Sequence, residues 1–282
     1  MKILKQLTLA VVAIALLFSC DKEKDYLVTF HTPYGDMKAV LFDQTPKHKA
    51  NFIKLAKSGA FDSTTFHRVI QEFMIQGGDV NQKPNSDKKI EYTVSAEFVD
   101  TLIHRRGAIA AARQGDRVNP KKESSGSQFY IVQGKKWTEK ELRDQKVDYP
   151  KLYKYFTHLV EDVQFNHLEE QVAELQSRRD NDALIELMLK HKDDIEKKYD
   201  IELDNPYPQE RIDIYTTEGG VPHLDDAYTV FGQVVEGMAV IDSIAKQKTG
   251  FRDKPVEDIY MSVEVEEIKK KKLIKLYGNL IH

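Results

Sequence analysis

The segment from Phe66 to Asp79, FHRVIQEFMIQGGD, constrains this chain more than any other stretch. Its β-branched and aromatic residues on either side of a Gln-Glu turn predict two short strands. In the second strand the two-residue period places Met74 and Gln76 on one face. Arg68 lies among these apolar residues. A lone arginine is most often a surface ion-pair residue, but here its five permanent donors predict a site that holds an uncharged polar group.

Two further regions have a similar mixed character, and the first of them consists of two segments, 107–113 and 125–132. Gly107–Arg113, GAIAAAR, is a strand of small residues, which leaves room for close backbone approach. Ser125–Val132 predicts a strand on which Gln128 and Tyr130 share a face. The residues alone leave open which face is core and which is a satisfied surface. Pro222–Val234, PHLDDAYTVFGQV, predicts a loop followed by another strand.

In this order, the three regions resemble the cyclophilins, the peptidyl-prolyl cis/trans isomerases with the motif FHRxIxxFMxQGGD. The resemblance implies a mostly β fold, an eight-stranded antiparallel barrel with two capping helices, here with an inserted α-helical segment. The barrel would be packed, so its peptide groove would lie on the outside.

The resemblance implies a catalytic role for Arg68 and a substrate-binding role for Phe73, Met74, Gln76, Ala112, Arg113, Gln128, Tyr130, His223, Leu224 and Tyr228. Four apolar or aromatic members would form the proline pocket: Phe73, Met74, Tyr130 and Leu224. Polar contacts to the peptide backbone would come from Gln76, Ala112 and Gln128.

Four of these positions depart from the best-known family pattern. Arg113 stands where many members have Asn, and Tyr130 replaces a Phe and brings a hydroxyl that needs a partner if it is buried. His223 takes the place of a Trp and Tyr228 that of a His. The changes affect substrate preference and inhibitor sensitivity, but they leave the arginine and the apolar floor in place.

Prolyl isomerisation breaks no covalent bond, so the reaction requires no nucleophile, cofactor or metal. His158, His167 and His191 are too far apart for a metal motif and are expected on surfaces or helix faces. The leading prediction is an isomerase that accelerates proline-limited folding of exported proteins, with extended or unfolded proline-containing chains as partners. The alternative is a catalytically weak peptide-binding or chaperone module that uses the same groove and the helical insertion.

The N-terminal residues predict export. Lys2 and Lys5 precede an apolar run that is too short to span a membrane and suits a signal peptide over residues 1–19. Cys20, the only cysteine, follows it in a context that resembles a bacterial lipobox, with 20–25 as a lipidated tether. The alternatives are simple cleavage or a small buried hydrophobe. We expect a lipid-anchored protein of the bacterial cell envelope, at the periplasmic face or cell surface. A net charge of −3 gives no electrostatic reason to expect nucleic acid.

The expected barrel domain has two parts, residues 26–136 and 218–270, with a tail over 271–282. Within it we expect a hairpin of residues 27–30 and 37–42 and helices over 46–58 and 238–245. A closing strand of alternating apolar residues is expected near 259–265.

The insertion, residues 137–217, has the pattern of helices. Thr138 and Glu141 predict a capping box, apolar residues recur at helical spacing from Leu152 onward, and Asn181 is expected to cap a further helix. The favoured interpretation is a helical hairpin packed on itself and on the barrel. The alternative is a client-binding arm beside the groove.

Overall fold

The computed structural model describes residues 24–83 and 89–278. The predictions for the signal peptide and for Cys20 lie outside these residues. The chain divides into two compact units, one formed by Met1–Lys135 with Gly220–His282 and the other by Lys136–Gly219. No helix within the described ranges has the length and hydropathy needed to cross a membrane.

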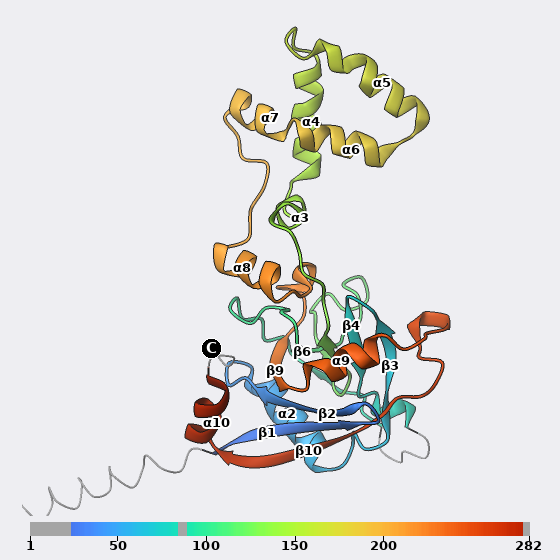
Figure 1. The fold of residues 1–282 in the computed structure, drawn as a ribbon, viewed down its shortest axis with the longest axis vertical. Coiled ribbons are helices and arrows are strands. Elements are labelled where there is room, and N and C mark those ends of the chain that lie inside the picture. The colour runs from blue at the N-terminus through green and yellow to red at the C-terminus, as the bar shows by residue number, and fades with distance from the viewer. Residues whose placement is uncertain (1–23, 84–88, 279–282) are drawn as a thin grey trace, which may run out of the picture. The chain divides into compact units, whose positions relative to one another are not determined.

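The first unit is a closed eight-stranded barrel, which confirms the predicted fold class (Figure 1). Around the barrel the order is β1-β10-β3-β4-β8-β6-β9-β2, and every neighbouring pair is antiparallel. The strands are β1 (Lys24–Thr32), β2 (Gly35–Leu41), β3 (Thr64–Ile70), β4 (Met74–Gly77), β6 (Ala108–Ala111), β8 (Phe129–Val132), β9 (Val230–Glu236) and β10 (Tyr260–Lys269). A separate two-stranded sheet pairs β5 (Thr93–Val94) with β7 (Ser124–Ser125).

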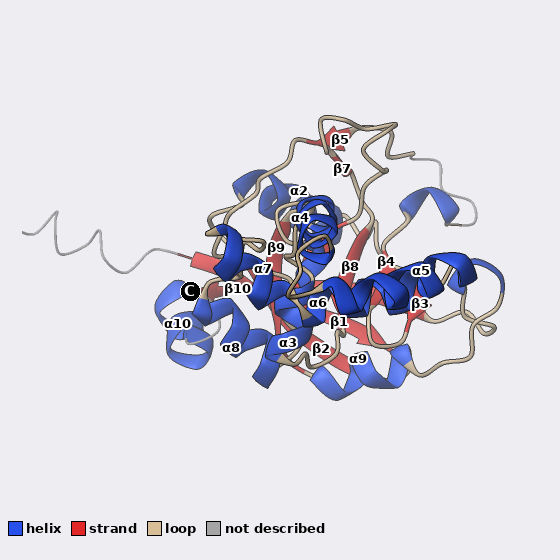
Figure 2. Cartoon of the chain, turned by 90° about the horizontal axis from the view of Figure 1, so that it is seen from above, coloured by secondary structure: helices blue, strands red, loops and turns tan. Residues whose placement is uncertain are grey.

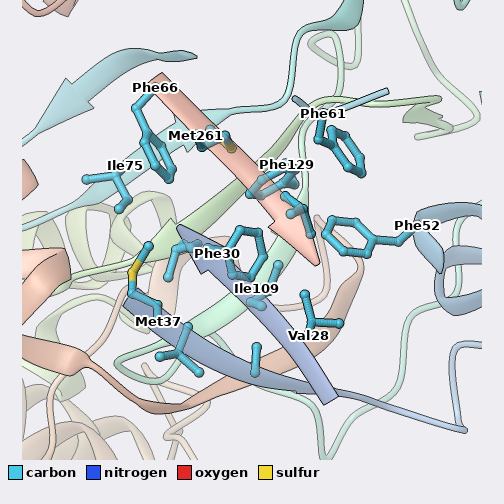
Figure 3. Packing of buried hydrophobic residues seen from close by; sticks show 14 of the residues in the cluster. Val28, Phe30, Met37, Phe52, Phe61, Phe66, Ile75, Ile109, Phe129 and Met261 are labelled. Atoms are coloured by element: carbon cyan, nitrogen blue, oxygen red, sulfur yellow. The ribbon is translucent and has the colours of Figure 1, made fainter. Parts of the chain in front are cut away.

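Aromatic side chains fill the barrel (Figure 3). The Phe129 ring lies 5.5 Å from those of Phe30 and Phe52 and 5.6 Å from that of Phe61, between centroids. These separations are typical of favourable tilted and edge-to-face pairs. Phe129 therefore belongs to the core, and its neighbour Tyr130 points to the other face of β8.

Two helices, α2 (Pro46–Lys57) and α9 (Met238–Ala245), lie on opposite sides of the strands (Figure 2). Both contribute buried residues to the main core: Phe52, Leu55 and Ala56 from α2, and Ile241, Ile244 and Ala245 from α9. Gly59 follows α2 with a φ of +67°, a left-handed conformation that ends a helix without the strain a Cβ would add.

Strand register aligns the polar residues of the predicted site. Arg68 on β3 lies opposite Gln76 on β4, which lies opposite Tyr130 on β8, which in turn lies opposite Ala110 on β6. The register shifts between Phe66 and Arg68, and such an irregularity re-aims a side chain. Four adjacent strands thus present their outward side chains to one region.

The second unit consists of short helices: α3 (Glu139–Asp144), α4 (Tyr149–Val160), α5 (Glu169–Arg178), α6 (Asn181–Lys190), α7 (Lys192–Tyr199) and α8 (Gln209–Thr217), with a 3₁₀ turn, η3 (Asn166–Leu168), before α5. The predicted capping box is present, because Thr138 accepts from the Glu141 amide and Glu141 accepts from that of Thr138. The unit has its own core of Val147, Leu152, Phe156, Leu159, Leu168, Met188, Ile195 and Leu203.

Two details of the predicted insertion are wrong. The prediction of one hairpin fails because the chain breaks at His191, between α6 and α7, and again before α8. The N-cap of α6 is Asp180 rather than Asn181, because the Asp180 carboxylate accepts from the amide of Ala183.

The predicted C-terminal tail is also wrong in part, because residues Lys270–Tyr277 form helix α10. Leu273 and Tyr277 are buried against Leu27, Val40 and Ile268 of the barrel. Their spacing of four residues places them on one side of the helix. The lysine run 269–272 is therefore the start of a packed helix rather than a free end.

The insertion leaves and rejoins the barrel at adjacent points. Gly220 donates from its amide to the carbonyl of Lys135 at 3.0 Å. A Cβ on Gly134 would lie 2.4 Å from the Gly220 Cα, so the close approach of the two segments requires glycine there. The two ends of the barrel unit that flank the insertion are thus joined by a backbone hydrogen bond.

Candidate active site

An open hollow of about 90 Å³ lies on the outer face of the barrel. Its lining consists of Arg68, Phe73, Met74, Gln76, Ala112, Arg113, Tyr130, Leu224 and Tyr228. These are nine of the eleven residues that sequence predicts for the site. The two others contact the lining: Gln128 accepts from Gln76, and the His223 ring stacks on that of Phe73 with 5.8 Å between centroids.

The floor of the hollow is apolar. Met74 and Tyr130 are 2% and 4% exposed and belong to a hydrophobic cluster with Ala110, Ala112 and Val132. Phe73 and Leu224, both partly buried, pack against the same cluster. The alanines of β6 leave space above the strand because their side chains are short. A small apolar ring would therefore be desolvated there.

Arg68 lines this hollow from β3, and its guanidinium is held on two sides. Its Nε donates to the Asp253 carboxylate at 3.3 Å, and its Nη1 points to Gln76 Oε1 at 3.5 Å. Asp253 belongs to η5 (Phe251–Asp253) and has a φ of +59°. The arginine side chain is 41% exposed, so its remaining donors are accessible to a ligand in the hollow.

A chain of hydrogen bonds fixes the neighbouring amides. Gln76 Nε2 donates to Gln128 Oε1 at 3.2 Å, and Gln128 Nε2 donates to Asp79 Oδ2 at 3.0 Å. The Asp79 carboxylate also accepts from Gln82 Nε2 at 2.8 Å. The orientation of both glutamine side chains is thereby set, because an ionised carboxylate can only accept.

Arg113, one of the departures from the family pattern, is a clamp at the edge of the hollow. Its Nε donates to the carbonyl of Ala227 at 2.7 Å, and its Nη1 donates to Asp116 at 2.6 Å. The guanidinium carbon lies 4.5 Å from the centroid of the Tyr228 ring, which is within cation–π range. Arg113 therefore holds the segment that carries Tyr228.

His223, another departure, packs beside the hollow on the ring of Phe73. Burial lowers its pKa, and nearby His104 lowers it further, whereas Asp225 opposes the shift. The ring is therefore neutral at pH 7 and stacks on Phe73 at an interplanar angle of 18°. It offers an aromatic surface where a tryptophan stands in the family pattern.

Two residues beneath the hollow were missed by sequence reasoning. His104, fully buried, lies with Nε2 2.9 Å from the Tyr130 hydroxyl and Nδ1 3.0 Å from Asp225 Oδ1. Its amide also donates to Asp225, at 2.9 Å. The signal that could have found His104 was the hydroxyl of Tyr130, because a buried tyrosine requires a hydrogen-bond partner.

The Tyr130–His104–Asp225 network keeps the floor apolar. With an ionised Asp225, the Nδ1–H of a neutral His104 donates to the carboxylate, so its Nε2 accepts from Tyr130. Burial raises the pKa of Tyr130 well above its usual value, with further contributions from Tyr228 and Asp225. The hydroxyl stays protonated and is engaged from below, so it does not face a bound ring.

Among the residues of the two described ranges, no group of His, Cys, Asp and Glu side chains could hold a metal ion.

Comparisons with known proteins identify the family. The family described as cyclophilin type peptidyl-prolyl cis-trans isomerase/CLD matches residues 27–182 and 208–265. A relative from Staphylococcus epidermidis, assigned to the peptidyl-prolyl cis-trans isomerases, is 31% identical over 249 residues, covering 87% of this chain and 94% of the relative. A Staphylococcus aureus relative with the same assignment is 32% identical and covers 85% of this chain and 91% of its own length.

Solved structures agree on the fold. A cyclophilin type peptidyl-prolyl cis-trans isomerase from Cryptosporidium parvum superposes with a TM-score of 0.50 at 20% identity, over 88% of this chain and 99% of that protein. The matched family, the relatives of similar length and the closed barrel lead to one conclusion. The chain belongs to the cyclophilin-type peptidyl-prolyl cis-trans isomerases.

Proposed function

We propose that this isomerase accelerates proline-limited folding of exported proteins and that Arg68 stabilises the twisted prolyl amide. One observation carries the proposal: the Arg68 guanidinium lines the same hollow as the apolar floor of Met74 and Tyr130. A proline ring held on that floor would place its amide within reach of the arginine donors.

The reaction is a rotation about the peptide bond before proline. Amide resonance sets a barrier of about 18–20 kcal/mol, and the twisted amide loses that resonance. Its prolyl nitrogen then becomes pyramidal and gains a localised lone pair. An Arg68 donor interacts more strongly with this nitrogen than with that of the planar amide, and such differential binding accelerates a reaction.

The required stabilisation is within reach of these residues. An uncatalysed prolyl bond isomerises in tens to hundreds of seconds, so a turnover on the order of a thousand per second requires roughly 7 kcal/mol. Removing one preorganised donor from an enzyme typically costs about 10²–10³ in kcat. Desolvation and clamping of the ring by Phe73, Met74, Tyr130 and Leu224 would supply the rest.

Polar groups beside the floor would hold the peptide backbone. The Gln76 and Gln128 amides are oriented by Asp79, so their free donors and acceptors are preorganised for an extended chain. On the other side, Ala112 presents little side chain and allows close backbone approach. We assign backbone recognition to these three residues.

Substitution of Arg68 tests the mechanism. Arg68→Ala should lower kcat/KM on a short X-Pro peptide by at least about a hundredfold, with an unchanged thermal unfolding midpoint because the side chain is 41% exposed. Arg68→Lys should remain strongly impaired because an ammonium cannot reproduce the planar fork. Arg178→Ala, which removes another exposed ion-paired arginine, on α5, serves as control. Wild-type turnover by Arg68→Ala would refute the proposed role.

For localisation we propose attachment through a lipid on Cys20, which lies outside the described residues. The support is the sequence context: an apolar run, a small residue and then the only cysteine of the chain. Cys20→Ser should release the protein from membranes into the soluble fraction. Retention of the Ser variant in washed membranes at high salt would contradict lipid attachment.

A further inference from the structure

Helix α10 carries an unusual set of charges at its first turn. Lys270, Lys271 and Lys272 occupy the N-terminal end, and there is no acidic residue in that turn. Cations are unfavourable at a helix N-terminus because the macrodipole places partial positive charge there. The stability of the helix therefore does not explain these lysines.

Only one of the four lysines of α10, Lys270, has an ion-pair partner among the described residues. Lys270 is paired with Asp43, whereas Lys271, Lys272 and Lys275 are exposed and form no ion pair within the described ranges. Three carboxylates near α10 pair with other groups: Asp43 with Lys49 and Lys270, Glu236 with Lys38 and Tyr277, and Glu267 with Lys24 and Lys57. A patch of three free lysines remains on a chain whose net charge is −3.

Apolar side chains flank these lysines. Ile274 and Leu276 are 44% and 52% exposed, while Leu273 and Tyr277 face the barrel. At 3.6 residues per turn, Ile274 and Leu276 lie on either side of the buried stripe and the three lysines lie between them on the outer side. Lysines beside exposed aliphatic residues are typical of helices that bind anionic membrane surfaces.

The barrel topology places the start of α10 beside the first residue of β1. In the β1–β10 pair Lys24 lies opposite Lys269, the residue that precedes α10 (Figure 1). Only three residues separate Cys20 from Lys24, and the four steps of chain between them span at most about 14 Å. A lipid on Cys20 would thus hold this end of the barrel within that distance of the bilayer.

We propose that α10 is a second membrane contact, which seats on anionic phospholipid headgroups through Lys271, Lys272 and Lys275. The inference rests on the proposed attachment at Cys20, which would bring this end of the barrel to the bilayer. The basic patch would then orient the barrel against the anionic headgroups. Each lysine near such a surface should strengthen binding about fivefold.

The test uses residues 20–282 with Cys20→Ser, so that no lipid is present. At low salt this protein should co-sediment with vesicles of phosphatidylcholine and phosphatidylglycerol but not with phosphatidylcholine alone, and added salt should release it. Reversal of all three charges, K271E/K272E/K275E, should weaken binding by at least about a hundredfold, because three attractions are lost and three repulsions are added. Glutamates at positions 271 and 272 are favourable in the first turn of the helix. Lys275 lies in the last turn but is exposed, so its change removes no buried contact and the fold should persist.

A matched control separates the patch from net charge. The triple variant K121E/K246E/K248E makes the same change in charge at other exposed barrel lysines and should bind vesicles severalfold more strongly than the α10 variant. Equal loss in both triple variants, or no binding of the unmodified α10 protein to anionic vesicles, would overturn the inference. Turnover of a tetrapeptide in solution should be normal in the α10 variant, whereas Arg68→Ala should lose turnover and keep vesicle binding. The outcome is therefore independent of the proposed catalytic role.

Discussion

The barrel and the inserted helices are built on different kinds of contact. Each barrel strand pairs on at least one side with a segment far away in sequence, as β1 does with β10. Their core residues, such as Phe30 and Ile75, are completely buried. In the insertion α5 buries no residue, and α6 and α7 bury one each, Met188 and Ile195.

The candidate site therefore lies on the unit with the more extensive core, whereas the inserted helices have few buried residues. The hollow is formed entirely by residues of the barrel unit, where paired strands fix side-chain positions closely. Few buried contacts mean low local stability, which is common in segments that adapt to partners. We therefore expect substitutions in the two units to have separable effects.

The largest expected effect comes from matched core truncations in the two units. Phe129→Ala should cost about 3–5 kcal/mol, because the ring packs on Phe30, Phe52 and Phe61, and turnover should fall with the folded fraction. Leu159→Ala, at a fully buried site of the insertion, should cost about 2–5 kcal/mol in that unit alone. Thermal unfolding should then show a separate early transition with normal tetrapeptide turnover. A single shared transition in Leu159→Ala would show that the units unfold together.

Removing the insertion tests its role. A short Gly/Ser linker can replace residues 138–217 because Lys135 and Gly220 already pair through their backbone. The insertion has its own core, so the shortened protein should keep tetrapeptide turnover within about twofold. If the helices bind clients, refolding of a proline-limited protein should slow severalfold, because uniform binding of larger chains affects KM. Loss of stability and of tetrapeptide turnover together would instead indicate a buttress. Equal activity on both substrates would exclude the client-binding role.

A smaller effect should distinguish two buried tyrosines within the barrel unit. Tyr130→Phe removes a hydroxyl that is hydrogen-bonded to His104 beneath the hollow. Tyr277→Phe removes a hydroxyl of α10 that is hydrogen-bonded to Glu236 of β9. Each should lower stability by about 1 kcal/mol. Only Tyr130→Phe should also raise the KM of a tetrapeptide, by about fivefold, because the floor is no longer held in place. Identical kinetics of both variants would mean that the network under the floor is only structural.

The smallest effect concerns pH. Burial lowers the pKa of His48, although Glu97 opposes the shift. The neutral ring forms hydrogen bonds through Nδ1 with Glu97 Oε2 at 2.7 Å and through Nε2 with Ser124 Oγ at 2.9 Å. The unfolded chain takes up this proton near pH 6.5 and the folded chain resists it, so the free energy of unfolding should fall as pH drops through 6.5. His48→Gln should flatten the dependence between pH 7 and 5 in urea unfolding. An unchanged slope would contradict the assignment.

Glu97, the carboxylate of this pair, acts at lower pH. Burial raises the pKa of Glu97, but hydrogen bonds from His48 and from the amides of His48 and Lys47 outweigh it, so the net pKa is lowered. Its contribution is present above pH 4.5 and is lost as pH falls through the lowered value. Glu97→Gln should reduce the extra loss of stability below pH 4.5.

Sequence predicted the parts of the molecule whose signals are local. The two-residue period placed Met74 and Gln76 on one face, and the motif resemblance implied the nine residues that line the hollow. His104 and Asp225 escaped because 121 residues separate them, and Asp253 lies 185 residues from Arg68. Only barrel closure brings these pairs together. Helix α10 escaped because consecutive lysines at its start oppose the dipole and have the pattern of a solvated tail.

The central claim is that Arg68 favours the twisted amide rather than the bound peptide. Exchange NMR on an X-Pro tetrapeptide can measure both the Kd and the cis/trans exchange rate on the enzyme. For Arg68→Ala we predict a Kd within about threefold of wild type and an exchange rate lower by at least about a hundredfold. Wild-type exchange in the variant, or a loss of affinity that accounts for the whole loss of rate, would contradict it.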